Sequence, residues 1–242
     1  MKTFKYAIFI GMVMLYASCG SSKYVLHQKV NAEDYLSEIK KELQVKWPEN
    51  KTINLVYHGH SVPSGYFNTP EVKTLSSYPY LVLKSLKERY PYAVINVIVT
   101  AIGGENSVKG AKRFKEDVLN HKPDVLFLDY GLNDRKVGLG NAKIAWEQMI
   151  EIALNQNIPI ILLTPSPDFR VDYSNPQNEL FQHTDQIRNL AKTYGIGVVD
   201  SYKVFEPLYS DLDTLKKYMA QVNHPNTKGH ELIANEIMKY FK

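Results

Sequence analysis

The segment Ile53-Asn54-Leu55-Val56-Tyr57-His58-Gly59-His60-Ser61 decides the fold prediction, because a short apolar run passes directly into glycine, histidine and serine. The apolar half, residues 53–56, predicts a buried β-strand. Gly59 permits a sharp turn and the close approach of a substrate, so Ser61 stands at the mouth of the strand as a candidate nucleophile. Glycine, serine and proline are also ordinary turn residues. A catalytic interpretation of Ser61 therefore needs partners from elsewhere in the chain.

The composition is that of an ordinary globular protein. The chain has 242 residues, 44% of them hydrophobic, which suits one α/β domain with a processed N-terminus. The formal charge of +4 falls to about +2 without Lys2 and Lys5, so the chain lacks the basic excess of a nucleic-acid-binding protein. The 17 tyrosines suit sugar stacking, but they suit an ordinary core better.

The first residues have the pattern of an export signal. Residues 1–5, a short region made basic by Lys2 and Lys5, precede the apolar run 6–16, which is too short to span a bilayer as a helix. Ala17-Ser18-Cys19-Gly20 resembles the lipobox of bacterial lipoproteins, although Tyr16 stands where leucine is usual. The alternative is an ordinary secretory signal with an incidental cysteine. Cys19 is the only cysteine, which excludes a disulfide within one molecule.

A lipidated Cys19 would make the mature protein membrane-tethered by its lipid, without a membrane-spanning segment. Gly20 and Ser21 follow the cysteine with no acidic residue beside it. By resemblance to lipoprotein sorting, this favours the outer membrane, at its periplasmic or its surface face.

Hydrophobic periodicity predicts alternating strands and helices over the rest of the chain. The strands are expected at 53–57, 93–100, 124–130, 159–163 and 196–199, and the helices at 31–45, 72–89, 107–120, 141–156, 177–193, 203–209 and 228–241. Residues 131–135 and 221–227 are expected to be loops. Five nearly continuous apolar strands alternating with helices predict a parallel sheet that is covered on both faces.

Four chemically suggestive residues stand at or near element ends. Ser61, Gly104 and Asn133 follow the first three predicted strands, and His224 precedes the last helix. Ligands bind at the carboxyl ends of parallel strands. Acyl transfer needs a serine, a histidine base and donors for a negative oxygen. Each residue also has a plain structural explanation as a turn or a helix cap, so the argument rests on all four occurring together.

At these residues the chain resembles the SGNH hydrolases, a branch of the GDSL esterase/lipase superfamily. The matching blocks are Gly59-His60-Ser61, Ile102-Gly103-Gly104-Glu105-Asn106-Ser107, Gly131-Leu132-Asn133-Asp134, and His224-Pro225-Asn226 with Gly229-His230. The third and fourth blocks are fairly specific. The resemblance covers about residues 52–241. It divides the chain into a signal peptide (1–18), a lipidated cysteine with tether and lead-in helix (19–50), and a hydrolase domain (51–242).

The resemblance implies a flavodoxin-like three-layer α/β/α sandwich with a five-stranded parallel sheet and an ester substrate. It implies Ser61 as nucleophile and His224 as base. The oxyanion donors would be the N–H groups of Ser61 and Gly104 and the side-chain amide of Asn133. No metal and no organic cofactor are implied.

Two positions depart from the family pattern. His60 stands where an aspartate is usual, and Gln221 stands where the family places the aspartate that orients the catalytic histidine. Loss of a triad carboxylate is costly in another fold. Three outcomes are open: a Ser–His dyad whose ring is oriented by a backbone carbonyl or by the Gln221 carbonyl, a carboxylate supplied by Asp211 or Asp213, or weak activity. The dyad is favoured, because both aspartates are expected a turn or more away.

Other nucleophile and nucleotide motifs do not fit. The α/β-hydrolase elbow requires G-x-S-x-G after several strands, whereas Pro63 occupies the fifth position and Ser61 follows the first strand of the domain. Gly103 and Gly104 form a lone pair without the flanking residues of a phosphate loop or a dinucleotide fingerprint.

The sequence therefore predicts a lipid-anchored serine esterase, with O-acetyl groups on carbohydrates as the expected substrate. The polar, aromatic segments 63–80 and 168–176 favour a sugar. A lipase, lysophospholipase or thioesterase is the alternative within the enzyme class. The rival from another class is a non-catalytic glycan-binding surface lipoprotein, for which Gln221 is the best support. No oligomeric state is predicted.

Overall fold

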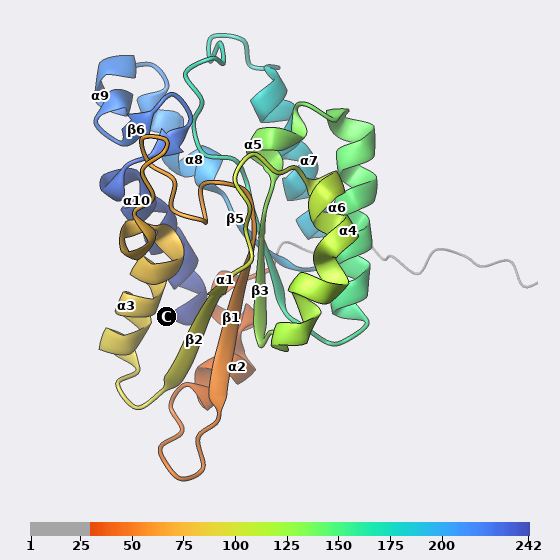
Figure 1. The fold of residues 1–242 in the computed structure, drawn as a ribbon, viewed down its shortest axis with the longest axis vertical. Coiled ribbons are helices and arrows are strands. Elements are labelled where there is room, and N and C mark those ends of the chain that lie inside the picture. The colour runs from red at the N-terminus through yellow and green to blue at the C-terminus, as the bar shows by residue number, and fades with distance from the viewer. Residues whose placement is uncertain (1–29) are drawn as a thin grey trace, which may run out of the picture.

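The computed structural model describes residues 30–242, and its centre is a five-stranded parallel sheet (Figure 1). The strands are β1 (Thr52–Gly59), β2 (Val94–Val99), β3 (Val125–Asp129), β4 (Ile160–Leu163) and β5 (Gly197–Val199). Their order in the sheet is β2-β1-β3-β4-β5. The chain therefore builds outward from β1 in one direction to β2, and in the other from β3 to β5. In such sheets the crevice between the two directions, at the carboxyl ends of β1 and β3, is where ligands bind.

Helices cover both faces of the sheet (Figure 1). The longer ones are α3 (Tyr78–Arg89), α4 (Ser107–Asp117), α6 (Gly138–Leu154), α7 (Glu179–Tyr194) and α10 (Thr227–Ile237). Side chains alternate along each strand, so Leu55 and Tyr57 join one apolar core with α3 and α10, while Val56 joins the other with α4, α6 and α7. The predicted three-layer α/β/α architecture is confirmed.

Two ends of the chain differ from the sequence prediction. The helix expected over 31–45 is two short helices, α1 (Ala32–Tyr35) and α2 (Ser37–Glu42), which meet at Leu36. The region expected as the loop 221–227 contains a small antiparallel pair, β6 (Met219–Gln221) and β7 (His224–Pro225). The helix expected over 203–209 is α8 (Ser201–Phe205) followed by the 3-10 turn η3 (Glu206–Leu208), and α9 (Leu212–Lys216) was not predicted.

Three further predictions were wrong in detail. The loop expected at 131–135 begins with a single helical turn, α5 (Gly131–Asp134). The helix expected from residue 72 starts at Tyr78, after the 3-10 turn η1 (Thr74–Ser76), because Pro79 fits only within a first helical turn. Strand β2 lies at the sheet edge and Val94 is 48% exposed, so this strand is not fully covered as the apolar pattern suggested.

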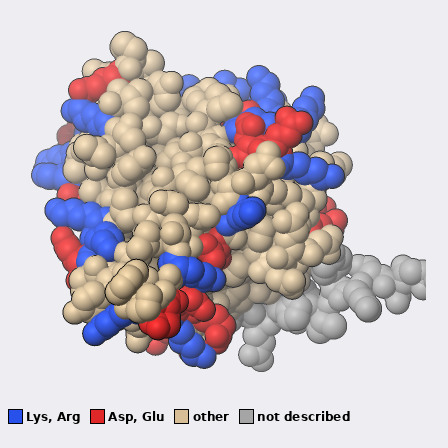
Figure 2. Space-filling view, turned by 60° about the horizontal axis from the view of Figure 1, so that its bottom comes forward, with Lys and Arg blue, Asp and Glu red and all other residues tan. Residues whose placement is uncertain are grey.

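Membrane attachment was predicted from residues 1–21, which lie outside the described residues, so the signal peptide and Cys19 have no structural account here. Within residues 30–242, no helix combines the length and the apolar character that a membrane crossing requires. Figure 2 shows basic and acidic side chains interspersed over the face turned to the viewer. That face carries no extended surface of a single charge.

Candidate active site

The loop that carries Ser61 is fixed by a close approach of β1 to β3. A Cβ atom at Gly59 would lie 2.4 Å from the backbone oxygen of Asp129, so only glycine fits there. The next residue, His60, donates its backbone N–H to the same oxygen at 3.2 Å. The chain then turns, and Ser61 is nearly buried, with 6% exposure. The nucleophile candidate therefore sits at the crevice between β1 and β3.

The structure brings His224 to Ser61 across 163 residues of sequence: Ser61 Oγ and His224 Nε2 lie 2.9 Å apart. His224 begins β7, just before α10. Asn226 caps that helix by accepting a hydrogen bond from the N–H of Gly229. A Cβ at Gly229 would lie 2.4 Å from the backbone oxygen of Tyr218, which explains the glycine. Asn226 and Gly229 of the terminal motif thus each have a local role that fixes the chain next to the histidine.

The other ring nitrogen of His224 faces a backbone carbonyl. Nδ1 lies 3.0 Å from the carbonyl oxygen of Phe67, which accepts a hydrogen bond when Nδ1 is protonated. Gln221 also reaches Nδ1, but with its amide nitrogen, at 2.6 Å. Its amide oxygen instead accepts the backbone N–H of Thr69 at 3.1 Å. The expected Gln221 carbonyl acceptor is therefore turned away from the ring, and the Phe67 carbonyl is the group that suits the tautomer with a free Nε2.

Neither aspartate considered from the sequence reaches His224. Asp211 is exposed and caps α9, accepting from the N–H groups of Asp213 and Thr214, and Asp213 pairs with Lys216. Among residues 30–242 no carboxylate is hydrogen-bonded to His224. The arrangement is a serine–histidine pair backed by a peptide carbonyl.

The electrostatic surroundings keep His224 neutral. Burial lowers the pKa of His224, and the positive charge of Arg170 lowers it further, while the hydrogen bond to the Phe67 carbonyl acts in the opposite direction. A base must be unprotonated to accept a proton. The lowered pKa leaves Nε2 free to accept the proton of the Ser61 hydroxyl at neutral pH.

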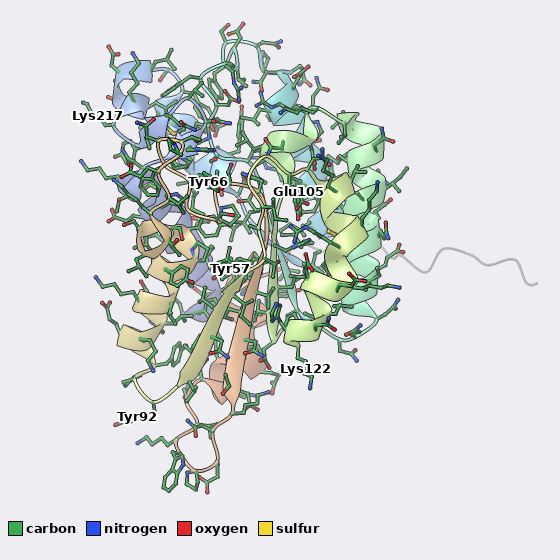
Figure 3. The ribbon with its side chains drawn as sticks, in the orientation of Figure 1. Tyr57, Tyr66, Tyr92, Glu105, Lys122 and Lys217 are labelled. Carbon is green, nitrogen blue, oxygen red and sulfur yellow. The ribbon has the colours of Figure 1, made fainter. Side chains whose placement is uncertain are left out.

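Gly104 and Asn133 lie in the same pocket as Ser61 and His224, which has a volume of about 710 Å³. Gly104 has φ of +77° with no atom near its missing Cβ, so glycine is needed for backbone conformation rather than for space. Asn133 donates one amide hydrogen to the backbone oxygen of Glu105 at 2.9 Å, which ties the two predicted donor segments together. Figure 3 shows Tyr66 and Glu105 near this end of the sheet, beyond the core residue Tyr57.

A buried ion pair, not anticipated from the sequence, anchors the loop that carries Gly104. Glu105 is 7% exposed and accepts hydrogen bonds from Arg113 Nε at 3.0 Å to both of its oxygens. Arg113 also donates to the backbone oxygen of Thr100 at 2.7 Å, and Tyr130 donates to Glu105 at 3.1 Å. The pair joins both ends of this loop to α4.

Two other buried polar groups fasten the motif blocks. The Asp134 carboxylate accepts the N–H of Ser107 at 2.8 Å and the indole N–H of Trp146 at 2.7 Å, so this residue of the third block holds the start of α4. His60, which replaces the usual aspartate, has Nε2 3.2 Å from an Asp129 oxygen, and its Nδ1 accepts the N–H of Val62 at 3.2 Å. His60 therefore holds the loop that carries Ser61 against β3.

In the described part of the chain, no three side chains of His, Cys, Asp or Glu come together in a way that could hold a metal ion. The pocket itself is lined mostly by polar and charged side chains, among them Arg135, Lys136, Arg170 and Glu179. These surroundings suit a hydroxylated ligand better than a long acyl chain.

The model of the GDSL-like Lipase/Acylhydrolase family matches residues 58–232. No curated protein sequence matches the chain.

Several solved structures share the fold. A two-domain esterase (CEX) active on acetylated mannans aligns with a TM-score of 0.70 and 20% identity, covering 90% of this chain and 54% of that one, so the chain spans about half its length. A catalytic mutant of Axe2, an acetylxylan esterase from Geobacillus stearothermophilus, aligns with a TM-score of 0.67 and 20% identity over 82% of this chain and 96% of that one. A putative GDSL-like lipase from Parabacteroides merdae aligns with a TM-score of 0.67 and 19% identity, covering 81% of this chain and 99% of that one.

Proposed function

Because the chain belongs to the GDSL-like lipase/acylhydrolase family, we propose that it is a serine esterase in which Ser61 is the nucleophile and His224 the general base. The observation that carries the proposal is the 2.9 Å contact from Ser61 Oγ to His224 Nε2. The Phe67 carbonyl on the far side of the ring supports the tautomer that this role requires.

The proposed reaction has two steps. The Ser61 oxygen attacks the ester carbonyl carbon while His224 Nε2 takes the hydroxyl proton, and the bond to the leaving alcohol breaks as His224 returns that proton to it. Water then attacks the acyl-enzyme, loses a proton to His224, and releases the acid as Ser61 is protonated again. The negative oxygen of each tetrahedral intermediate would be stabilised by the N–H groups of Ser61 and Gly104 and the amide of Asn133.

We propose an O-acetyl group on a carbohydrate as the substrate. The fold is shared with esterases described as active on acetylated mannans and as an acetylxylan esterase. The polar lining of the pocket, with Thr69 and Asn223 beside the charged residues, supports a sugar rather than the apolar groove that a lipase, lysophospholipase or thioesterase needs. The paired Ser61 and His224 argue against a non-catalytic glycan-binding protein.

We further propose that the protein is exported and anchored to a membrane, the outer membrane being favoured, through lipid on Cys19. The support is the lipobox-like Ala17-Ser18-Cys19-Gly20 after a basic and apolar leader. We expect a Cys19→Ala variant to incorporate no radiolabelled fatty acid and to leave the membrane fraction. Equal labelling of the variant and the wild-type protein would contradict the lipoprotein assignment.

The esterase assignment is tested with purified protein on p-nitrophenyl acetate and butyrate, with Ser61→Ala beside Ser210→Ala, an exposed serine away from the pocket, as the matched control. Loss of the nucleophile should lower the rate by at least about 10³-fold, while the control keeps its rate. Hydrolysis that does not depend on Ser61 would refute the proposed serine esterase with Ser61 as its nucleophile. A preference for long acyl chains over acetate would refute the O-acetyl group as the substrate. Binding of a glycan without any Ser61-dependent turnover would establish the non-catalytic alternative.

A further inference from the structure

One wall of the Ser61 pocket carries three cationic side chains. Arg135 and Lys136 follow α5, and Arg170 lies in the loop after β4, and all three line the pocket. Glu179, at the start of α7, is the one acidic residue in the lining. An acetyl ester and the hydroxyls of a neutral sugar offer nothing that requires this positive excess.

Both arginines are held in place by a carboxylate behind them. Asp168 has an exposure of 0%. One of its oxygens accepts from Arg170 Nε at 2.8 Å, and the other accepts from Arg170 Nη2 at 2.6 Å and from Arg135 Nη2. Although burial raises it, these hydrogen bonds bring the pKa of Asp168 below its usual value, so the carboxylate stays ionised. One negative charge thus holds two guanidinium groups, and a net positive charge remains at the pocket wall.

Donor groups on these cations are left for a ligand. Within residues 30–242, the Nη1 groups of Arg135 and Arg170 make no hydrogen bond, and the ammonium of Lys136 has no ion pair. The positive charge also extends to the reacting end of the pocket, since Arg170 contributes to the lowered pKa of His224. The wall therefore holds two arginines fixed by Asp168 and one exposed lysine, which line the same pocket as Ser61.

We propose that the substrate is an acetylated anionic glycan. Arg170 and Lys136 bind the carboxylate of a uronic-acid-type sugar that lies next to the acetylated sugar. The inference rests on the esterase proposed above and names its substrate class. A planar guanidinium matches a planar carboxylate in geometry, and a lysine adds a flexible point charge. A neutral xylan or mannan leaves the same donors without a charged partner.

The decisive experiment compares two polymers that differ only in charge. Polygalacturonate and its carboxyl-reduced counterpart are each chemically acetylated to the same degree, and acetate release by the purified protein is measured. We expect kcat/KM to be about tenfold higher on the acidic polymer, and no more than that, because exposed cations contribute modestly to binding. The difference should lie in KM rather than in kcat. The preference should shrink between about 50 mM and about 500 mM NaCl as screening increases. Equal kcat/KM on both polymers at low salt would overturn the proposal.

Variants identify the residues. Lys136→Gln and Arg170→Gln should each lower the acidic-to-neutral ratio roughly three- to tenfold. Arg170→Lys should retain only part of the ratio, because the charge remains while the planar guanidinium is lost. Lys84→Gln, which removes an exposed lysine outside the pocket, is the matched control. If kcat/KM favours the acidic polymer equally in the wild-type protein and in both charge-removing variants, Arg170 and Lys136 are not the binding site of the carboxylate. Loss of Ser61-dependent hydrolysis of p-nitrophenyl acetate is a separate result, which concerns the esterase itself.

Discussion

The proposed base, His224, has uncharged hydrogen-bond partners, and one substitution can place a negative charge beside it. In Gln221→Glu, one carboxylate oxygen can keep the N–H of Thr69 while the other accepts from His224 Nδ1 and from the Thr69 hydroxyl, which the amide nitrogen now contacts at 3.1 Å. A nearby negative charge favours protonated imidazole. We expect the acid limb of the kcat/KM profile, set by His224, to move to higher pH by about one unit.

The same substitution should raise kcat several-fold above pH 8, because a carboxylate also stabilises the imidazolium that forms during attack. Gln221→Ala is the control, and it should leave the acid limb in place while lowering kcat only about two- to fivefold, since the Phe67 carbonyl still orients the ring. If the pH profile of Gln221→Glu superimposes on that of the wild-type protein, residue 221 does not act on the pKa of His224, and the prediction is wrong.

Residue order was enough to select the four site candidates, because parallel strands place their carboxyl ends at one edge. Ser61, Gly104 and Asn133 follow successive strands, and the structure gathers them with His224 in one pocket. The Phe67 carbonyl could not have been selected, because a peptide oxygen has no identity in the sequence. The orientation of the Gln221 amide depends equally on a backbone group, the N–H of Thr69.

At the scale of elements, the loop between β2 and α4 depends on the buried pair of Glu105 and Arg113. The two side chains are 8% and 16% exposed. Removing Arg113 leaves a carboxylate without its partner, so we expect Arg113→Leu to lower the free energy of unfolding by about 3–5 kcal/mol and to lower kcat as the loop carrying Gly104 loosens. Denaturant unfolding and steady-state kinetics measure the two effects.

A double variant separates the charge from the packing. Glu105→Leu combined with Arg113→Leu removes both charges, so it should be less destabilised than Arg113→Leu alone, by more than about 1 kcal/mol. Its kcat should stay low, because the loop has still lost its anchor to α4. A double variant that unfolds as easily as the single one would show that packing, rather than the unpaired carboxylate, determines the loss.

Periodicity predicted the long elements well and the short ones poorly. Helix α6 (Gly138–Leu154) and the strands were expected within a few residues of their observed ends, because apolar residues at regular spacing face a core. The hairpin of β6 and β7 has too few residues for a period, and it exists because α10 and its cap hold the chain there. The two arginines on the pocket wall come from loops, and only the buried Asp168 brings them together.

At the scale of the whole molecule, three buried histidines are held in neutral form. Burial lowers the pKa of His58 to about 3, of His183 to about 4 and of His230 to about 3. Each ring has an ordinary pKa of about 6.5 in the unfolded chain. Above that value these groups are neutral in both states, so their titration gives the free energy of unfolding no pH dependence.

Below pH 6.5 the unfolded chain binds protons that the folded protein does not, so the free energy of unfolding falls as pH falls. Each histidine contributes a slope of up to about 1.4 kcal/mol per pH unit until its folded pKa is reached. Asp134, whose pKa is raised by burial, acts in the opposite direction at lower pH. Three such groups outweigh one, and we expect several kcal/mol of stability to be lost between pH 6.5 and pH 4.5.

His230→Asn tests this expectation, because the asparagine oxygen can still accept the N–H of Tyr78 that His230 Nδ1 accepts at 3.1 Å. The variant should lose stability at pH 7.5 but show a shallower decline toward pH 4.5, by about 1.4 kcal/mol per pH unit, in urea unfolding. His121→Asn, at an exposed position, should keep the wild-type slope. Parallel declines for His230→Asn and the wild-type protein would mean that His230 is not the group that the unfolded chain protonates, and the acid sensitivity would then have to come from carboxylates.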